Sequence, residues 1–151
     1  MKKPFENKIF ALNRSRRKYQ ILDKLEAGIV LTGPEVKSIK AGQANISDSY
    51  IKISAGELWL IGAQISSYRF SNQLLNPKRD RKLLLNKSEI IRLAGKLTRG
   101  ITLIPLKIYQ KRTRIKIEIA LARGLKLYNK KQLLKEKQVR RETARELKNL
   151  E

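Results

Sequence analysis

The stretch that most constrains the fold runs from Glu26 to Tyr50, with the sequence EAGIVLTGPEVKSIKAGQANISDSY. It begins in an apolar run at 28–31 that is typical of a strand, and it then breaks at a Thr-Gly-Pro turn. Pro34 suits the first position of a helix, where its missing N–H would have no partner anyway. Gly42 suits the left-handed residue that follows a helix end. The stretch therefore predicts a strand, a tight turn, a short helix and a polar loop.

Alternating sequence predicts an antiparallel sheet around this stretch. From Tyr19 to Leu31 the odd positions are mostly apolar, and a period of two indicates one long strand with one buried face. Two further strands are expected at 50–53 and 58–65, joined by a hairpin turn at 54–57.

The clearest alternation lies at 113–122, and a turn at 110–112 joins it to a strand at 101–109. Its isoleucines are expected to enter the core, while Arg114 and Lys116 point together toward solvent. Pro105 has no N–H to give to a sheet, so we expect an edge or a bulge there.

A helix is predicted at about 87–98. Asn86 suits its N-cap, and Glu89, three residues later, suits the reciprocal partner of a capping box. Leu85 and Ile90 occupy the apolar positions that flank such a cap.

Both ends of the chain are basic. Residues 1–18 predict a solvated, partly disordered arm with a cationic cluster at 14–18. Residues 126–151 contain nine Lys or Arg and four Glu, without a broad apolar stripe. Such a segment is expected to be disordered alone and helical on a partner. We therefore expect one domain over 1–125 and a basic tail over 126–151.

The net charge of +22 comes from 35 Lys or Arg against 13 Asp or Glu. Self-repulsion of this size destabilises a compact chain unless a polyanion neutralises it, so RNA, DNA or an anionic membrane are candidate partners. The chain has no Cys and no His, which excludes thiol chemistry and an imidazole base. No catalytic constellation, metal site or cofactor motif is found. Without a signal peptide or an apolar span, a cytoplasmic protein with no membrane partner is expected.

The predicted strands and basic loops favour an OB-like antiparallel β-barrel of six or more strands, with two or three short helices and a basic C-terminal tail. Cations that face a phosphate backbone release counterions, which gives affinity without reading sequence. Tyr128 lies among lysines and either stacks on a base or packs back on the barrel; the sequence leaves both open.

Several runs resemble the SsrA-binding protein (small protein B) family of bacterial trans-translation. The matching runs are ALNR at 11–14, the whole of 26–50, IGAQIS at 61–66, RKLLLNKSEI at 81–90 and, more loosely, ALARGLKLYNKK at 120–131. Three departures stand out. Asn129 replaces an Asp, Val139 replaces a large aromatic residue, and the arm between Asn13 and Tyr19 is one residue short.

The resemblance implies a non-enzymatic RNA-binding adaptor without cofactors, and we expect a monomer. Such a protein binds the tRNA-like domain of tmRNA (SsrA RNA) and brings alanyl-tmRNA to the empty A site of a stalled ribosome. Elongation factor Tu with GTP travels with the complex. The body replaces the missing anticodon arm, and the tail enters the vacant mRNA channel beside small-subunit rRNA.

Motif position and charge indicate two sets of contact residues. The expected tmRNA contacts are Asn13, Arg14, Glu26, Arg81, Lys82, Leu84, Lys116, Arg123 and Gly124. The expected ribosome contacts in the tail are Tyr128, Lys130, Lys131, Lys135, Lys137, Val139, Arg140 and Arg141. Glu26 either accepts hydrogen bonds from RNA or holds a neighbouring Arg. A structural ribosomal protein and, more weakly, an enzyme acting on RNA stay open as alternatives.

Overall fold

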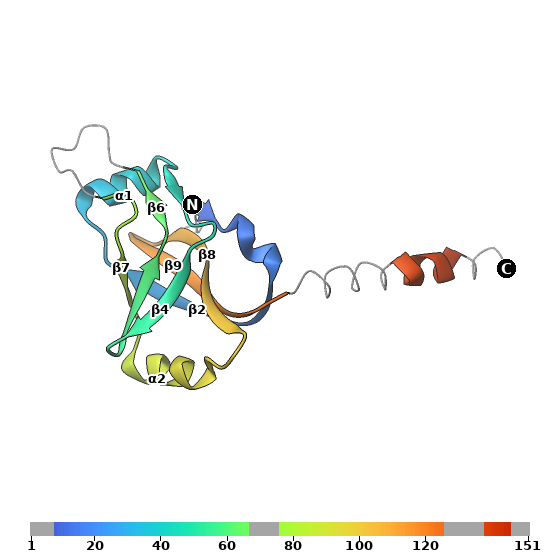
Figure 1. Ribbon diagram of the computed structural model, residues 1–151. Helices are drawn as coiled ribbons and strands as arrows, with labels where there is room; N and C mark the ends of the chain where they lie inside the picture. The colour runs from blue at the N-terminus through green and yellow to red at the C-terminus, as the bar shows by residue number, and fades with distance from the viewer. Residues whose placement is uncertain (1–7, 67–75, 126–137, 146–151) are drawn as a thin grey trace, which may run out of the picture.

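The computed structural model describes residues 8–66, 76–125 and 138–145. Its strands are β1 (Ile9–Leu12), β2 (Tyr19–Ile29), β3 (Ala44–Asn45), β4 (Tyr50–Ser54), β5 (Glu57–Ile61), β6 (Gln64–Ile65), β7 (Arg81–Leu84), β8 (Ile101–Lys111) and β9 (Arg114–Gly124). Its helices are the 3-10 helix η1 (Arg14–Lys18), α1 (Gly33–Lys40) and α2 (Lys87–Lys96), and 138–145 is also helical. Figure 1 shows the strands curled into one body, with α1 at the top of the view and α2 at the bottom.

Six strands close into a ring. The order is β8-β4-β5-β7-β2-β9, all neighbours are antiparallel, and β9 pairs back onto β8. Along β8, Leu103 pairs with β4, whereas the segment 107–109 pairs with β1. β8 therefore closes the barrel at one end and carries β1 at the other. The prediction of a mainly β, OB-like antiparallel barrel with short helices is confirmed.

The strand, turn and helix predicted within 26–50 are present. Thr32 is the N-cap of α1 and its side chain accepts from the backbone N–H of Glu35, whose carboxylate accepts from the N–H of Thr32 at 3.0 Å. Pro34 lies in the first turn, and Gly42 has the left-handed φ of 78° that the helix end requires. This reciprocal cap fixes where the chain leaves β2 and enters α1.

Helix α2 forms where it is predicted, but its cap differs. Asn86 is the N-cap residue, yet its side chain makes no capping hydrogen bond. The capping box predicted for Asn86 and Glu89 is therefore wrong. Apolar packing holds the helix instead, because Leu93 is fully buried and Leu85 and Ile90 pack against the main core.

Both predicted hairpins are present. The turn between β4 and β5 lies at Ala55 and Gly56, between the paired Ser54 and Glu57. The turn between β8 and β9 is shorter than predicted and centres on Arg112, which has a φ of 57°. The reason is that 110–111 stays in the ladder, opposite 114–115 of β9.

The buried residues form two clusters on opposite faces of the same strands. The main cluster fills the barrel, whereas Ile104, Leu106, Ala120 and Ala122 form a second one, with Tyr19 and Ile21 of β2 packed against it. The register of β2 on β9 shifts between Ile21 and Asp23, so the odd positions change face there. A single buried face for 19–31 is therefore wrong. The register of β8 shifts at Pro105, which confirms the predicted bulge.

The N-terminal arm is more ordered than predicted from residue 8 onward. β1 pairs with β8, and the N–H of Asn13 donates to the carbonyl of Leu106 at 2.8 Å. The arm thus belongs to the sheet up to η1, because its backbone groups have ladder partners. Among the helices of the described residues, none has the length and apolar character of a membrane span.

Candidate nucleic-acid interface

Glu26 lies at the centre of a charged surface on the outer faces of β2, β9 and β8. Its carboxylate accepts from the hydroxyl of Tyr109 and from Lys111 Nζ, which lies 3.1 Å and 3.3 Å from the two oxygens. Both partners stand on β8, so these contacts reach across β9, where Glu118 pairs with Glu26 in register. We call this surface the Glu26 face; its residues are Lys24, Glu26, Lys107, Tyr109, Lys111, Arg114, Lys116 and Glu118.

The electrostatics of this face keep Glu26 charged and Tyr109 protonated. The hydrogen bond from Tyr109 holds the pKa of Glu26 below its ordinary value, with Lys111 and Lys116 acting in the same direction against partial burial. Burial and the Glu26 carboxylate both raise the pKa of Tyr109. Glu26 therefore holds Tyr109 and Lys111 rather than an Arg, and its side chain is still 36% exposed. A carboxylate has further acceptor sites for base or sugar donors.

Gly28 opens a hollow beside Glu26. It pairs with Leu84 of β7 on one side and with Lys116 of β9 on the other. Because Gly28 has no side chain, a hollow of about 280 Å³ opens there, with Leu84, Val36 and Ile115 among its lining residues. A Cβ on Gly28 would lie 3.2 Å from the Cβ of Leu84, so a larger residue would press on this wall.

A neighbouring hollow of about 570 Å³ is lined by Glu26, Lys111, Lys116 and residues of the β8–β9 turn. The two hollows share Arg114 and Lys116 in their linings. The structure therefore brings together the predicted residues Glu26, Leu84 and Lys116. They combine an apolar floor for a base with cations for phosphates and an acceptor for donors on a base edge.

Four other predicted residues lie at the opposite end of the β2–β9 ladder. Arg123 and Gly124 end β9 and pair with the start of β2, roughly 23 Å from Lys116 at ~3.3 Å per strand residue. Arg14 is exposed in η1, and its N–H donates to Ser47 Oγ at 2.9 Å. Seven of the nine predicted tmRNA residues thus form two groups and not one patch.

Asn13 belongs to this second group but is only 2% exposed. Its amide donates to the carbonyl of Pro105 at 2.6 Å, and its side-chain oxygen accepts from the N–H of Ser15 at 2.8 Å. Both ends of the side chain are therefore occupied inside the protein. Asn13 caps η1 and ties the arm to the bulge of β8, so the expectation of direct RNA contact by its side chain is corrected to a positioning role.

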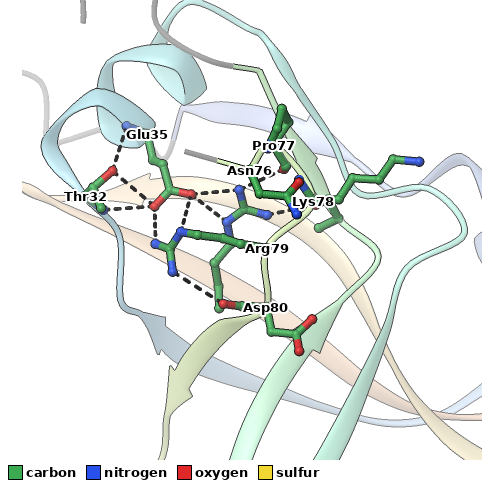
Figure 2. A network of polar contacts seen from close by, with 9 residues as sticks. Thr32, Glu35, Asn76, Pro77, Lys78, Arg79 and Asp80 are labelled. Atoms are coloured by element: carbon green, nitrogen blue, oxygen red, sulfur yellow. Dashed lines mark hydrogen bonds and ion pairs between the residues drawn. The ribbon is translucent and has the colours of Figure 1, made fainter. Parts of the chain in front are cut away.

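Arg81 is the clearest correction, because its side chain is fully buried. Its guanidinium donates to Glu35 at 2.7 Å, to the carbonyl of Ala63 at 2.8 Å and to that of Pro77 at 2.9 Å. Arg79 also binds Glu35, and Figure 2 shows Glu35 between Thr32 and Arg79. Arg81 joins α1 to the start of β7 and offers no charge to an outside ligand.

Some of the remaining predicted residues lie within the described part of the chain, and the others lie outside it. Lys82 points outward from β7, on the same face as Leu84, and pairs with Glu57 at 3.0 Å. Val139, Arg140 and Arg141 lie in the helix at 138–145 and are exposed. The other predicted tail residues lie outside the described residues: Tyr128, Lys130, Lys131, Lys135 and Lys137. Within the described ranges, no three His, Cys, Asp or Glu side chains gather as a metal site would require.

Sequence reasoning missed Tyr109 and Glu35. The sequence indicates Lys107 and Lys111 as cations of an exposed hairpin, but with the turn expected at 110–112 nothing shows that Tyr109 points outward between them. Glu35 has the Thr-x-x-Glu spacing of a capping box after Thr32. That spacing identifies the cap, although no local pattern reveals the two arginines that approach from 44 and 46 residues away.

Comparison with known proteins gives consistent results. The family model described as "SmpB protein" matches residues 9–149. An SsrA-binding protein of Trichormus variabilis is 49% identical over 146 residues, which cover 94% of each chain. One of Thermosynechococcus vestitus is 48% identical over 93% of this chain and 95% of its own. A solved chain described as "tmRNA-SmpB: a journey to the center of the bacterial ribosome" aligns with a TM-score of 0.64 and 42% identity, covering 83% of this chain and 87% of that one.

Proposed function

The chain belongs to the SmpB protein family, and from this membership we propose that it is a tmRNA-binding protein of trans-translation. It binds the tRNA-like domain of tmRNA and delivers alanyl-tmRNA to the A site of stalled ribosomes. It acts by binding and not by catalysis. Elongation factor Tu belongs to the delivery complex, and the work takes place in the cytoplasm, where ribosomes translate.

The observation that carries this proposal is the arrangement on the Glu26 face. An oriented carboxylate, an apolar hollow over Gly28 and a surplus of cations lie on adjacent strands. Phosphate contacts fix an RNA in place, whereas the carboxylate and the hollow discriminate among bases and shapes. A surface that served charge neutralisation alone would need neither a buried tyrosine partner for Glu26 nor the hollow beside Leu84.

The test compares two polyanions of equal charge, a tRNA-like tmRNA fragment and duplex DNA. We expect tighter, salt-sensitive binding of the RNA. We expect Lys116→Gln to weaken RNA binding several-fold, because it removes a phosphate partner. We expect a similar loss for Leu84→Ser, because it places a polar side chain in the apolar hollow. Lys87→Gln, on α2 and outside both hollows, is the matched control. Equal affinity of the unmodified protein for the two polyanions would contradict the proposal.

The tail is assigned a separate task, because residues 138–145 carry exposed Val139, Arg140 and Arg141. Deleting the chain from Lys126 onward is expected to leave most RNA affinity in place and to stop peptide tagging on stalled ribosomes. Filter binding measures the first quantity, and a reconstituted translation assay measures the second. Loss of RNA binding by the truncated protein would show that body and tail do not divide the work in this way.

A further inference from the structure

A second outward surface centres on Trp59, the single tryptophan of the chain. Trp59 on β5 pairs in register with Lys52 on β4 and with Lys82 on β7. Directly opposed residues of an antiparallel sheet have Cβ atoms ~4.5–5.5 Å apart. The indole therefore stands between two lysine side chains in one row across three strands, which we call the Trp59 row.

The Trp59 row faces away from the core. Leu58 and Leu60, on either side of Trp59, are 0% exposed, whereas Trp59 itself is half-buried and Lys52 is exposed. Tyr50 points the same way from β4 and is 46% exposed. Because side chains alternate along strands, this face of β4, β5 and β7 presents two aromatic rings beside two cations.

The row is separate from the Glu26 face. In the ring of six strands, β5 lies three strands from β9 in either direction, and Figure 1 shows the β4 strand in front of β2 and β9. Glu26, Lys111 and Lys116 stand on β2, β8 and β9, none of which carries a residue of the Trp59 row, although Lys82 shares β7 with Leu84 of the Gly28 hollow. The two surfaces have room for two different segments of a ligand.

The charges of Lys52 and Lys82 indicate which kind of ligand the Trp59 row can bind. Lys82 has one carboxylate partner, Glu57, and both side chains are about two-fifths exposed at 39% and 43%. Lys52 makes no ion pair within the described residues. Cations around an aromatic ring that is partly open to solvent are the combination that single-stranded nucleic acids bind, since phosphates contact the cations and unpaired bases stack on the ring.

We propose that the Trp59 row binds unpaired RNA nucleotides, with one base stacked on the indole and the adjoining phosphates against Lys52 and Lys82. In a duplex the faces of the bases are already stacked on one another, so no base is free to stack on the indole of Trp59. This site goes beyond the proposed recognition of the tRNA-like domain, because its centre is on β5, outside both hollows, and it takes another form of RNA.

Fluorescence of the full-length protein tests the proposal, because every tryptophan signal comes from Trp59. Titration with a short oligoadenylate is expected to quench the emission to saturation. Trp59→Leu, measured by anisotropy of a labelled oligonucleotide, is expected to weaken binding roughly 5- to 150-fold, equivalent to ~1–3 kcal/mol. Trp59→Phe keeps a smaller ring and is expected to restore part of the affinity.

Lys52→Gln is expected to lower the slope of log affinity against log salt by ~0.7, the value for one phosphate contact on a single strand. Lys87→Gln is the matched control and should leave the slope unchanged. Leu84→Ser should still show quenching by oligoadenylate, which separates this site from the Glu26 face. Equal quenching by inorganic polyphosphate, which has no bases, or unchanged oligonucleotide affinity of Trp59→Leu would overturn the proposal.

Discussion

Glu35 joins three parts of the chain through one carboxylate. It accepts from the N–H of Thr32 at the start of α1, and it binds the guanidinium groups of Arg79 and Arg81. Burial alone would raise the pKa of Glu35, but these hydrogen bonds and charges outweigh it and hold the pKa below the ordinary value of 4.5. α1 and β7 supply Val36 and Leu84 to the hollow over Gly28, so Glu35 also fixes the shape of the candidate site.

Glu35→Gln is expected to destabilise the protein by ~3–5 kcal/mol near neutral pH, because it leaves buried Arg81 without its countercharge. Since the folded-state pKa of Glu35 is depressed, its stabilisation is full above the ordinary value of 4.5 and is lost as pH falls below it. The difference between the two proteins should therefore shrink from pH 6 to pH 3 in urea titrations. Glu57→Gln, which breaks an exposed pair, should cost only ~0–1 kcal/mol. A constant difference at every pH would contradict this role.

At the same scale, the sequence separates the site residues incompletely. Charge and motif position indicated Glu26, Leu84 and Lys116, and the structure places them on adjacent strands. The same reasoning predicted Arg81 on the surface. The sequence around a basic residue at the start of a strand does not show whether its side chain points into the core or toward solvent. Its burial follows from Glu35, Ala63 and Pro77, which only the folded chain brings close.

At the scale of elements, local patterns predicted the strands and helices but not their irregularities. The alternation in 113–122 and the turn residues at 54–57 identify their hairpins, because both signals are local. The bulge near Leu22 has no comparable local signal, because a bulge is an extra residue in one strand relative to the strand that it pairs with. Alternation therefore predicted a buried face for β2 and missed that the face changes sides.

The hairpin between β4 and β5 offers a local test. Ala55 and Gly56 have φ values of 52° and 74°, and a two-residue turn of this kind favours Asn-Gly. Ala55→Asn is expected to stabilise the protein by about 1 kcal/mol, because Asn tolerates the left-handed region better than Ala. The melting temperature should rise by about 2–4 °C for a domain of this size. Gly56→Ala should lower it, and a rise for that variant would contradict the assigned turn.

At the scale of the whole molecule, the closed barrel depends on pairings between distant strands. β2 pairs with β9, and β1 with β8, across roughly a hundred residues of chain. Composition indicated a small basic barrel but could not give this strand order. The order matters for function, because it puts Glu26 on β2 and Trp59 on β5, with β7 between these two strands.

The net charge of +22 should make the stability of the free protein depend on salt. Raising the salt from ~10 mM to ~1 M shortens the Debye length from ~30 Å to ~3 Å, which weakens repulsion among the cations. Calorimetry should show a melting temperature several degrees higher at high salt. Potassium chloride and potassium glutamate should act alike if screening is the cause. A melting temperature that falls with salt would show that ion pairs outweigh the repulsion.

The register shift near Leu22 has a consequence for how this chain tolerates change. If the pairing of 19–21 with β9 is kept, one residue more or fewer between Ile21 and Lys24 would reverse the direction of every later side chain of β2. Glu26 would then point into the apolar core, and Ala27 would take its place on the outer face. A substitution in this strand alters the contacts of one side chain. An insertion or deletion instead exchanges the core-facing residues with the solvent-facing residues. The number of residues between Ile21 and Glu26 is therefore as much a part of the binding surface as the residues that form it.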